Sequence, residues 1–281
     1  MTSHPAFVAG RGAVITGGAS GIGLATAHYC ADLGMPLFLA DIDAAALEAA
    51  STTLRASHPG LTIETIVTDV AKRQDVQRLH DRAVKAGPIG LVMNNAGVEG
   101  GGGLAADAAR WHEIIDTNLW GVINGVQIFT PTLMAQGGPA AIVNTGSKQG
   151  ITMPPGDTAY NVSKAGIKAV TEALAHDLRE AGSLVTAHLL IPGFTFTGFT
   201  RKRVAEKPDA AWTPAQVVDF MADRLGEGDF YILCPDNAVT PSLDHKRIAW
   251  AAGDIIHNRP ALSRWHKDYQ AAFDAFIKQG D

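Results

Sequence analysis

Short apolar runs alternate with longer, Ala- and Leu-rich segments along most of the chain. Such runs recur at 12–16, 36–41, 62–69, 89–95, 140–145, 184–191 and, less strongly, 229–234. Most are apolar at nearly every position, which is typical of strands buried on both faces of a parallel sheet. Helix-start residues such as Asp43 and Asp107 stand between them. The alternation predicts an α/β fold, a doubly wound parallel sheet of about seven strands.

Composition favours one globular domain and excludes several classes of protein. The chain has 281 residues, 46% of them hydrophobic, and α/β domains of about 250 residues are common, so one domain is expected. The net charge of −5, with few clustered basic residues, predicts no nucleic-acid partner. Two cysteines, Cys30 and Cys234, argue against a disulfide framework. No apolar stretch approaches the ~18 residues of a membrane span, so we expect a cytoplasmic protein without a membrane partner.

A glycine-rich stretch, TGGASGIG at 16–23, follows the first predicted strand and precedes a helix. Gly17, Gly21 and Gly23 would let the backbone turn tightly, approach a pyrophosphate and pack the helix against the sheet. The N-terminus of that helix would supply free N–H groups and a partial positive charge. The stretch in this context predicts a dinucleotide-binding site.

The second predicted strand ends in Asp41, eighteen residues after Gly23. An acidic side chain at this place accepts hydrogen bonds from the adenosine ribose hydroxyls, and its charge would repel a 2′-phosphate. No arginine stands beside Asp41, and position 20 of the glycine-rich stretch is Ser20, not a basic residue. These features favour NAD over NADP.

Tyr160 and Lys164 lie four positions apart in TAYNVSKAG at 158–166. A helix places such residues one turn apart on the same face. Alone, the pair is equally compatible with two solvated surface side chains. Whether the pair is catalytic has to be judged together with the other motifs of the chain.

Together the motifs resemble those of the classical short-chain dehydrogenases/reductases, from about residue 10 to 200. NNAG at 94–97 is similar to the family's motif after the fourth strand, and IPGFTFTG at 191–198 to its segment after the sixth. The resemblance implies a Rossmann-type fold with a cofactor half at about 10–145, a catalytic and substrate half at about 146–235 and a helical C-terminal extension at about 236–281. The cofactor-binding residues expected are Gly17, Ser20, Gly21, Ile22, Gly23, Asp41, Ile42, Asp69, Val70, Asn95, Ala96, Gly97, Tyr160, Lys164, Pro192, Gly193, Thr195 and Thr197.

The resemblance also implies a catalytic tetrad of Asn118, Ser147, Tyr160 and Lys164. A free tyrosine has a pKa near 10, and a nearby ammonium together with the positive nicotinamide favours its phenolate, so a lowered pKa is expected for Tyr160. Tyr160 would exchange a proton with the substrate oxygen while hydride passes to or from NAD. Ser147 would orient that oxygen, Lys164 would bind the nicotinamide ribose, and Asn118 would hold a proton path through water.

The substrate pocket is expected to form from 98–105, 148–156 and the loop from Phe194 to about Trp212. These segments would bring Ser147, Met153, Phe194, Phe196 and Phe199 near the reacting carbon, which suggests an apolar or aromatic secondary alcohol or ketone. Aromatic residues in a loop can equally pack on one another. Lys148 is the one candidate for binding a carboxylate or phosphate of the substrate. The alternative is that its side chain simply reaches solvent.

Function is therefore predicted as NAD-dependent dehydrogenation of a secondary alcohol or reduction of a ketone. The alternatives are a non-catalytic NAD(H)-binding sensor or scaffold and, within the class, an NADPH-dependent carbonyl reductase. The histidines show no metal-ligand spacing, so no metal site is expected. The resemblance implies a homodimer or homotetramer. The C-terminal extension could cover the pocket, extend an interface or pack on the sheet, and we favour the last.

Overall fold

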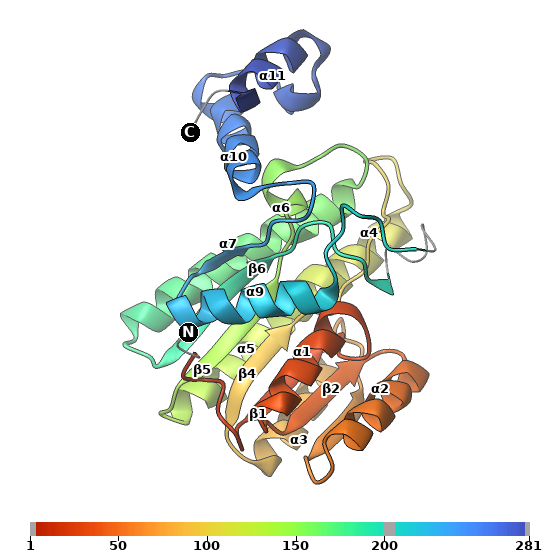
Figure 1. Ribbon diagram of the computed structural model, residues 1–281, viewed down its shortest axis with the longest axis vertical. Helices are drawn as coiled ribbons and strands as arrows, with labels where there is room; N and C mark the ends of the chain where they lie inside the picture. Colours follow the sequence, from red (N-terminus) through yellow and green to blue (C-terminus); the bar gives the residue numbers. More distant parts are fainter. Residues whose placement is uncertain (1–3, 199–205, 279–281) are drawn as a thin grey trace.

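A computed structural model describes residues 4–198 and 206–278 of the protein, and its centre is a sheet of seven parallel strands (Figure 1). The strands are β1 (Gly12–Thr16), β2 (Leu37–Asp41), β3 (Ile63–Val67), β4 (Ile89–Asn94), β5 (Ala140–Thr145), β6 (Val185–Ile191) and β7 (Tyr231–Leu233). Their order in the sheet is β3-β2-β1-β4-β5-β6-β7. The predicted doubly wound, Rossmann-type parallel sheet is confirmed.

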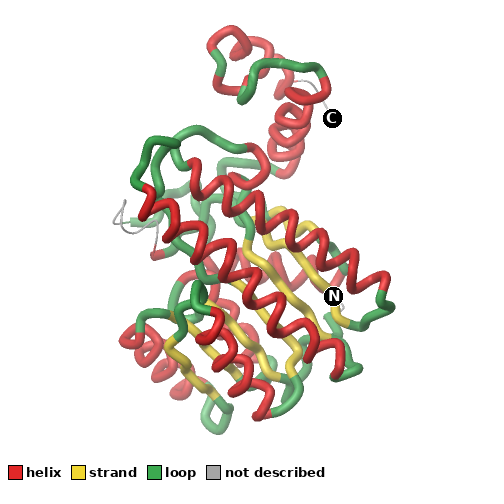
Figure 2. Tube along the Cα trace, turned by 180° about the vertical axis from the view of Figure 1, so that it is seen from behind, coloured by secondary structure: helices red, strands yellow, loops and turns green. Residues whose placement is uncertain are grey.

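Helices cover both faces of this sheet, and each face has its own apolar cluster. One face is covered by α1 (Gly21–Asp32), α2 (Ala44–Ser57) and α9 (Pro214–Glu227). The other, facing the viewer in Figure 2, is covered by α3 (Arg73–Ala86), α5 (Gly121–Ala135) and α7 (Thr158–Glu180). Burial on both faces explains why the strands are apolar at nearly every position.

The predicted helix starts are confirmed at two aspartates. The Asp43 side chain accepts a hydrogen bond from the Ala46 N–H at 3.0 Å and begins α2. Asp107 accepts one from the Ala109 N–H at 3.0 Å and begins α4 (Ala108–Ile114). In each case a carboxylate satisfies an N–H that the first turn of a helix leaves without a partner.

Two strands, β3 and β7, are each three residues shorter than the sequence predicts. β3 ends at Val67 and not at Asp69, because the Asp69 carboxylate accepts a hydrogen bond from the Ala71 N–H at 3.1 Å and turns the chain. β7 covers three residues, since only Leu189–Ile191 of β6 pairs with it. The ends of these strands depend on which residues pair between strands, and the apolar pattern alone does not predict that pairing.

The C-terminal extension stands away from the sheet at the top of Figure 1. It contains α10 (Pro241–Ile256), two short turns of 3₁₀-helix (Ser263–Trp265 and Lys267–Tyr269) and α11 (Gln270–Lys278). Trp250 packs on Phe273 and Phe276, with ring centroids 5.3 Å apart in both pairs. Among the described elements its main contact outside itself is between α10 and α6 (Gln149–Thr152). The expectation that it packs on the sheet is wrong, because its aromatic side chains pack on one another.

Within the two described ranges, no helix has both the length and the apolar character needed to cross a lipid bilayer.

Candidate active site

The carboxyl ends of β1, β4, β5 and β6 surround a cavity of about 1160 Å³. It lies where the chain order of the strands reverses between β1 and β4, the usual ligand position in doubly wound sheets. The predicted site residues that line it are Gly17, Ser20, Gly21, Ile22, Asp41, Ile42, Asp69, Val70, Asn95, Ala96, Gly97, Ser147, Tyr160, Lys164, Pro192, Gly193, Phe194, Thr195 and Thr197. Segments far apart in the sequence therefore meet at one cavity, as the motifs predict.

The glycine-rich loop has the backbone shape that a pyrophosphate requires. Gly17 and Gly21 have φ angles of +63° and +55°, in the left-handed region that favours glycine. A Cβ atom on Gly23 would lie 2.2 Å from the Gly17 carbonyl oxygen, so only glycine lets α1 approach the loop this closely. The loop and the N-terminus of α1 thus leave an open cradle against the cavity, and these residues fit a dinucleotide.

Asp41 lies at the far end of the cavity from Tyr160 along the sheet edge, at the end of β2. Its carboxylate accepts hydrogen bonds from the N–H groups of Ala19 and Asp43, each at 3.2 Å. These bonds hold the carboxylate beside the glycine-rich loop. It is therefore fixed where a ribose bound along that loop would lie.

The NNAG segment braces the strand ends around the cavity. The Asn94 amide donates to the Asn144 side chain at 2.8 Å, joining β4 to β5. The hydroxyl of Thr16 accepts from the N–H groups of Asn95 at 2.9 Å and Ala96 at 3.1 Å, joining β4 to β1. These hydrogen bonds hold the carboxyl ends of β1, β4 and β5 together beside the cavity.

Asn118 lies behind the cavity wall, fully buried, in a stretch of π-helix (Ile115–Trp120) between α4 and α5. Its side chain accepts from the Val98 N–H at 2.7 Å and donates to the Val98 carbonyl at 2.9 Å and to the Ser163 hydroxyl at 3.1 Å. Both amide protons are therefore in use, so the side chain braces the wall and has no proton left for water. The sequence predicts an ordinary helix here. Single-turn π-helices frequently occur at functional sites.

Tyr160 and Lys164 project from α7 into the cavity, with the Lys164 Nζ 5.5 Å from the centre of the Tyr160 ring. The ammonium is buried and donates to the Thr145 carbonyl at 2.8 Å. Burial lowers the pKa of Lys164 to about 8. Burial also raises the pKa of Tyr160 to about 12, against the opposite effect of a hydrogen bond with Ser147. In the free protein, without the positive nicotinamide on which the expected lowering depends, desolvation of the phenolate outweighs its partners.

Lys148 follows Ser147 and lines the cavity, but its ammonium is engaged by two acidic side chains. Its Nζ lies 2.5 Å from a carboxylate oxygen of Asp244 and 3.5 Å from one of Asp236. Both carboxylates are 5% exposed. Burial raises the pKa of Asp244, and the nearby Lys148 opposes that rise. Neither predicted role of Lys148 is correct, since the two acidic partners come from a distant part of the chain.

Two predicted substrate-pocket residues remain apart from the cavity. Met153 and Phe196 are absent from its lining. Met153 ends α6 in a left-handed conformation, and the Phe196 N–H donates to the Trp212 carbonyl at 2.8 Å. Phe199 lies outside the described residues. Of the aromatic residues proposed to contact substrate, Phe194 lines the cavity and is 42% exposed.

Several acidic side chains that the sequence did not single out also line the cavity. Glu99, Glu113 and Asp116 border the cavity on the side of Val98. Asp157 holds a different loop, the one after β4, by accepting hydrogen bonds from the N–H groups of Gly100 at 2.8 Å and Gly101 at 2.9 Å. Glu99 and Asp157 contribute to the raised pKa of Tyr160. Glu99 and Asp157 stand beside the NNAG and TAYNVSKAG stretches, but neither residue belongs to a pattern that would mark it as part of the site.

Known proteins share both the sequence and the architecture of this chain. The family model described as short chain dehydrogenase matches residues 11–208. The 1-deoxy-11-beta-hydroxypentalenate dehydrogenase of Streptomyces exfoliatus is 33% identical over 263 residues, which cover 91% of this chain and 94% of that protein. A short-chain dehydrogenase/reductase from Burkholderia phymatum, crystallised with NAD, superposes with a TM-score of 0.80 at 35% identity, covering 89% of this chain and 96% of that one.

A second solved structure, a metagenomic short-chain oxidoreductase in complex with NADP, has a TM-score of 0.69 at 24% identity, covering 82% of this chain and 98% of that one. At this identity the likeness concerns the fold. A doubly wound sheet, a dinucleotide cradle and a tyrosine–lysine pair at one cavity define a nicotinamide-dependent oxidoreductase. The chain belongs to the short-chain dehydrogenase/reductase family.

Proposed function

We propose that the protein transfers a hydride between NAD and a secondary alcohol or ketone, with Tyr160 as the acid and base. The observation that carries this proposal is the meeting of Ser147, Tyr160 and Lys164 with the glycine-rich loop at one cavity. A scaffold protein would need the cradle alone. The placement of a proton-carrying phenol beside a buried lysine favours catalysis over sensing.

The preference for NAD rests on Asp41 and on the distribution of charge around the cavity. Among the described lining residues the basic ones are Lys148 and Lys164, both at the catalytic end. Near the glycine-rich loop the lining carries Asp41 and Asp43. A 2′-phosphate would meet carboxylates there and no cation from the described residues, so NADP should bind more weakly.

In the reduction direction Tyr160 supplies the proton. Its raised pKa means that the phenol holds its proton at neutral pH and can donate it to the substrate oxygen. Ser147, which hydrogen-bonds with Tyr160, would hold that oxygen beside the phenol. NAD, when bound, supplies the site that accepts or releases hydride.

In the oxidation direction Tyr160 must lose its proton first. The Lys164 ammonium stabilises the phenolate, and at pH 7 the larger share of Lys164 is still protonated because its pKa is about 8. Its position next to Gly97 would also let it hold a ribose hydroxyl. Since both amide protons of Asn118 are occupied, its side chain would hold the cavity wall and not a water molecule.

The substrate is proposed to be uncharged and fairly apolar. Phe194 presents an exposed ring at the cavity, and Lys148 is neutralised by Asp236 and Asp244. Asp116 in the cavity lining would repel a carboxylate or phosphate, whereas the Glu113 carboxylate is already paired with Arg110. A ketone or secondary alcohol with an aliphatic or aromatic substituent fits these surroundings.

A homodimer or homotetramer belongs to the same proposal. Trp120 is 51% exposed at the end of the π-helix, and Val162 is 45% exposed on α7. The π-helix and α7 lie against each other, so the two side chains are available to one partner surface.

The first test is titration of the purified protein with NADH and NADPH by nicotinamide fluorescence, followed by a panel of aliphatic and aromatic ketones. We expect tighter binding of NADH and its oxidation by at least one uncharged ketone. Tight binding of NADH without turnover of any ketone or alcohol would favour the sensor or scaffold. Binding of NADPH alone would favour the NADPH-dependent carbonyl reductase.

A further inference from the structure

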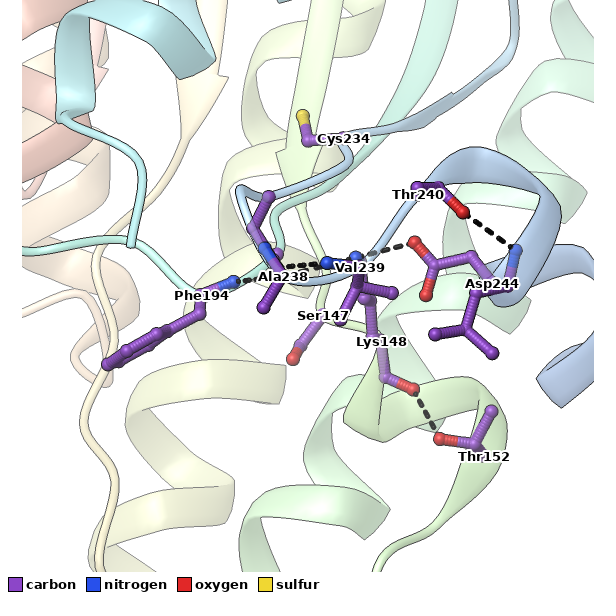
Figure 3. A network of polar contacts seen from close by, with 12 residues as sticks. Ser147, Lys148, Thr152, Phe194, Cys234, Ala238, Val239, Thr240 and Asp244 are labelled. Atoms are coloured by element: carbon purple, nitrogen blue, oxygen red, sulfur yellow. Dashed lines mark hydrogen bonds and ion pairs between the residues drawn. The ribbon is translucent and has the colours of Figure 1, made fainter. Parts of the chain in front are cut away.

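A buried cluster of charges joins the catalytic serine to the C-terminal extension. Figure 3 shows Lys148, Phe194 and Asp244, from three segments far apart in sequence, gathered at one place. Lys148 belongs to the loop after β5, and Asp244 to the first turn of α10. The Lys148 ammonium lies between Asp244 and Asp236, at 2.5 Å and 3.5 Å. We call Lys148, Asp236 and Asp244 the clasp.

Asp236 extends the clasp to the loop after β6. One of its carboxylate oxygens accepts from the Phe194 N–H at 3.1 Å, while the other accepts from the N–H groups of Ala238 at 3.1 Å and Val239 at 2.8 Å. The oxygen that binds Phe194 is also the one nearest to Lys148. Lys148 therefore fixes a carboxylate that in turn fixes the backbone of a cavity-lining residue.

The fit of the clasp against this loop is tight. A Cβ atom on Gly193 would lie 2.8 Å from Asp236 Oδ2 and 3.0 Å from Lys148 Nζ. Gly193 and Phe194 both line the cavity, and so do Ser147 and Lys148. A small displacement of the clasp would thus move the loop after β5 and the loop after β6 relative to each other.

We propose that the clasp positions Ser147 against the loop 192–198, and that Asp244 of the C-terminal extension acts on catalysis through Lys148. The inference rests on the proposed function for its kinetic consequence. A single buried cation shared by two carboxylates holds its geometry only while all three are present. The extension thereby contributes a positioning residue to a cavity that its helices do not line.

The test compares Asp244→Asn with Asp254→Asn. Asp254 also lies on α10 and pairs with Arg259 at 2.9 Å, with both side chains largely buried, but it does not touch the clasp. Asp244→Asn should lower kcat about tenfold, as small misplacements of reacting groups do, and raise the NADH dissociation constant less than about threefold. It should also speed amide hydrogen exchange over 192–198. Asp254→Asn should change none of these quantities.

Lys148→Met provides a second test, because in that background the effect of Asp244→Asn on kcat should change from a decrease to an increase. It removes the cation that Asp236 and Asp244 share and leaves two neighbouring carboxylates, although Arg247 still acts on Asp244. Adding Asp244→Asn in that background therefore removes the repulsion between them and should raise kcat. Equal effects of Asp244→Asn in both backgrounds would overturn the proposal. If Lys148→Met does not fold, the comparison of Asp244→Asn with Asp254→Asn decides.

The exchange measurement separates this inference from the proposed function. Wild-type exchange over 192–198 in the Asp244→Asn variant overturns the clasp, even in an active enzyme. The same loss of protection in Asp254→Asn also overturns it, since the extension would then act only by being folded. A wild-type protein that binds NADH but turns over no alcohol or ketone refutes the proposed function, while the exchange result still stands for or against the clasp.

Discussion

The Lys164 ammonium and the Tyr160 ring lie 5.5 Å apart in one cavity wall, and the hydrogen bond of the ammonium goes to the Thr145 carbonyl. The ammonium is therefore held by the end of β5 and not by a bond to the phenol. Burial works against both charged forms, with a pKa of about 8 for Lys164 and about 12 for Tyr160. The pair is set to keep the proton on tyrosine in the free protein.

The buried lysine should make stability depend on pH. Because its pKa falls from 10.5 to about 8 on folding, the unfolded chain binds more protons above pH 8, and the free energy of unfolding rises with pH there. Relative to Lys164→Met, the wild-type protein should gain about 2 kcal/mol between about pH 7.5 and about pH 9.5. Above the ordinary tyrosine pKa of 10.0, Tyr160 has the opposite effect, because the folded protein retains the proton up to about 12.

Urea unfolding at the two pH values measures this gain. Lys168→Met is the matched control, since Lys168 lies one turn further along α7 and is 37% exposed in an ion pair with Glu172. A pH dependence that is the same in wild type and Lys164→Met would show that Lys164 is not desolvated as described.

Tyr160→Phe should abolish proton transfer while leaving the cradle intact. The ring remains and only the hydroxyl is lost, so kcat should fall by about a thousandfold and the NADH dissociation constant should change less than about twofold. Steady-state kinetics and fluorescence titration measure the two quantities. Tyr231→Phe, which removes the hydroxyl of a half-exposed tyrosine that bonds Glu172, should keep full activity. Retained turnover in Tyr160→Phe would remove tyrosine from the mechanism.

Asp41→Asn should shift the cofactor preference. The amide keeps the shape and one oxygen acceptor of the carboxylate but removes the charge that repels a 2′-phosphate. The ratio of NADPH to NADH dissociation constants should fall about tenfold, mostly through tighter NADPH binding. Asp43→Asn is the control, because it removes a carboxylate two residues away and an asparagine can still cap α2. It should shift the ratio of dissociation constants less. An unchanged ratio in Asp41→Asn would mean that other residues discriminate between NADH and NADPH.

Gly23→Ala should close the dinucleotide cradle. The added methyl group would lie 2.2 Å from the Gly17 carbonyl oxygen, so the loop or α1 must move. NADH binding should weaken at least about tenfold, since the N–H groups at the helix start no longer face the pyrophosphate. Gly103→Ala adds the same group where nothing lies within 4 Å, and should bind NADH as the wild type does. Isothermal titration calorimetry measures both.

Local patterns predicted much of the fold and of the cavity. Apolar runs identified the strands, and the glycine-rich stretch identified the cradle, because each depends on residues close together in the chain. Asp41 could be assigned in the same way, since strand and helix lengths fix its distance from Gly23. These features need no knowledge of which strands are neighbours.

Features that depend on distant partners escaped prediction. Lys148 was assigned to solvent or substrate because nothing near it reveals Asp236 and Asp244. The burial that raises the pKa of Tyr160 in the free protein could not be predicted either, because burial depends on the whole fold. The C-terminal aromatic residues showed a helical period, but the sequence does not say that they pack around Trp250 instead of the sheet.

The π-helix at Ile115–Trp120 makes the helical run through 108–135 behave as a regular helix with one residue inserted. Each residue of an α-helix turns its successor by about 100°, so removing one residue there would restore regular geometry and turn one half of the run relative to the other. Either the Ile114 side chain would leave the interior, or the Asn118 side chain would lose its hydrogen bonds with Val98 and Ser163. The active site thus depends on the rotational phase of a helix as much as on the residues that it carries.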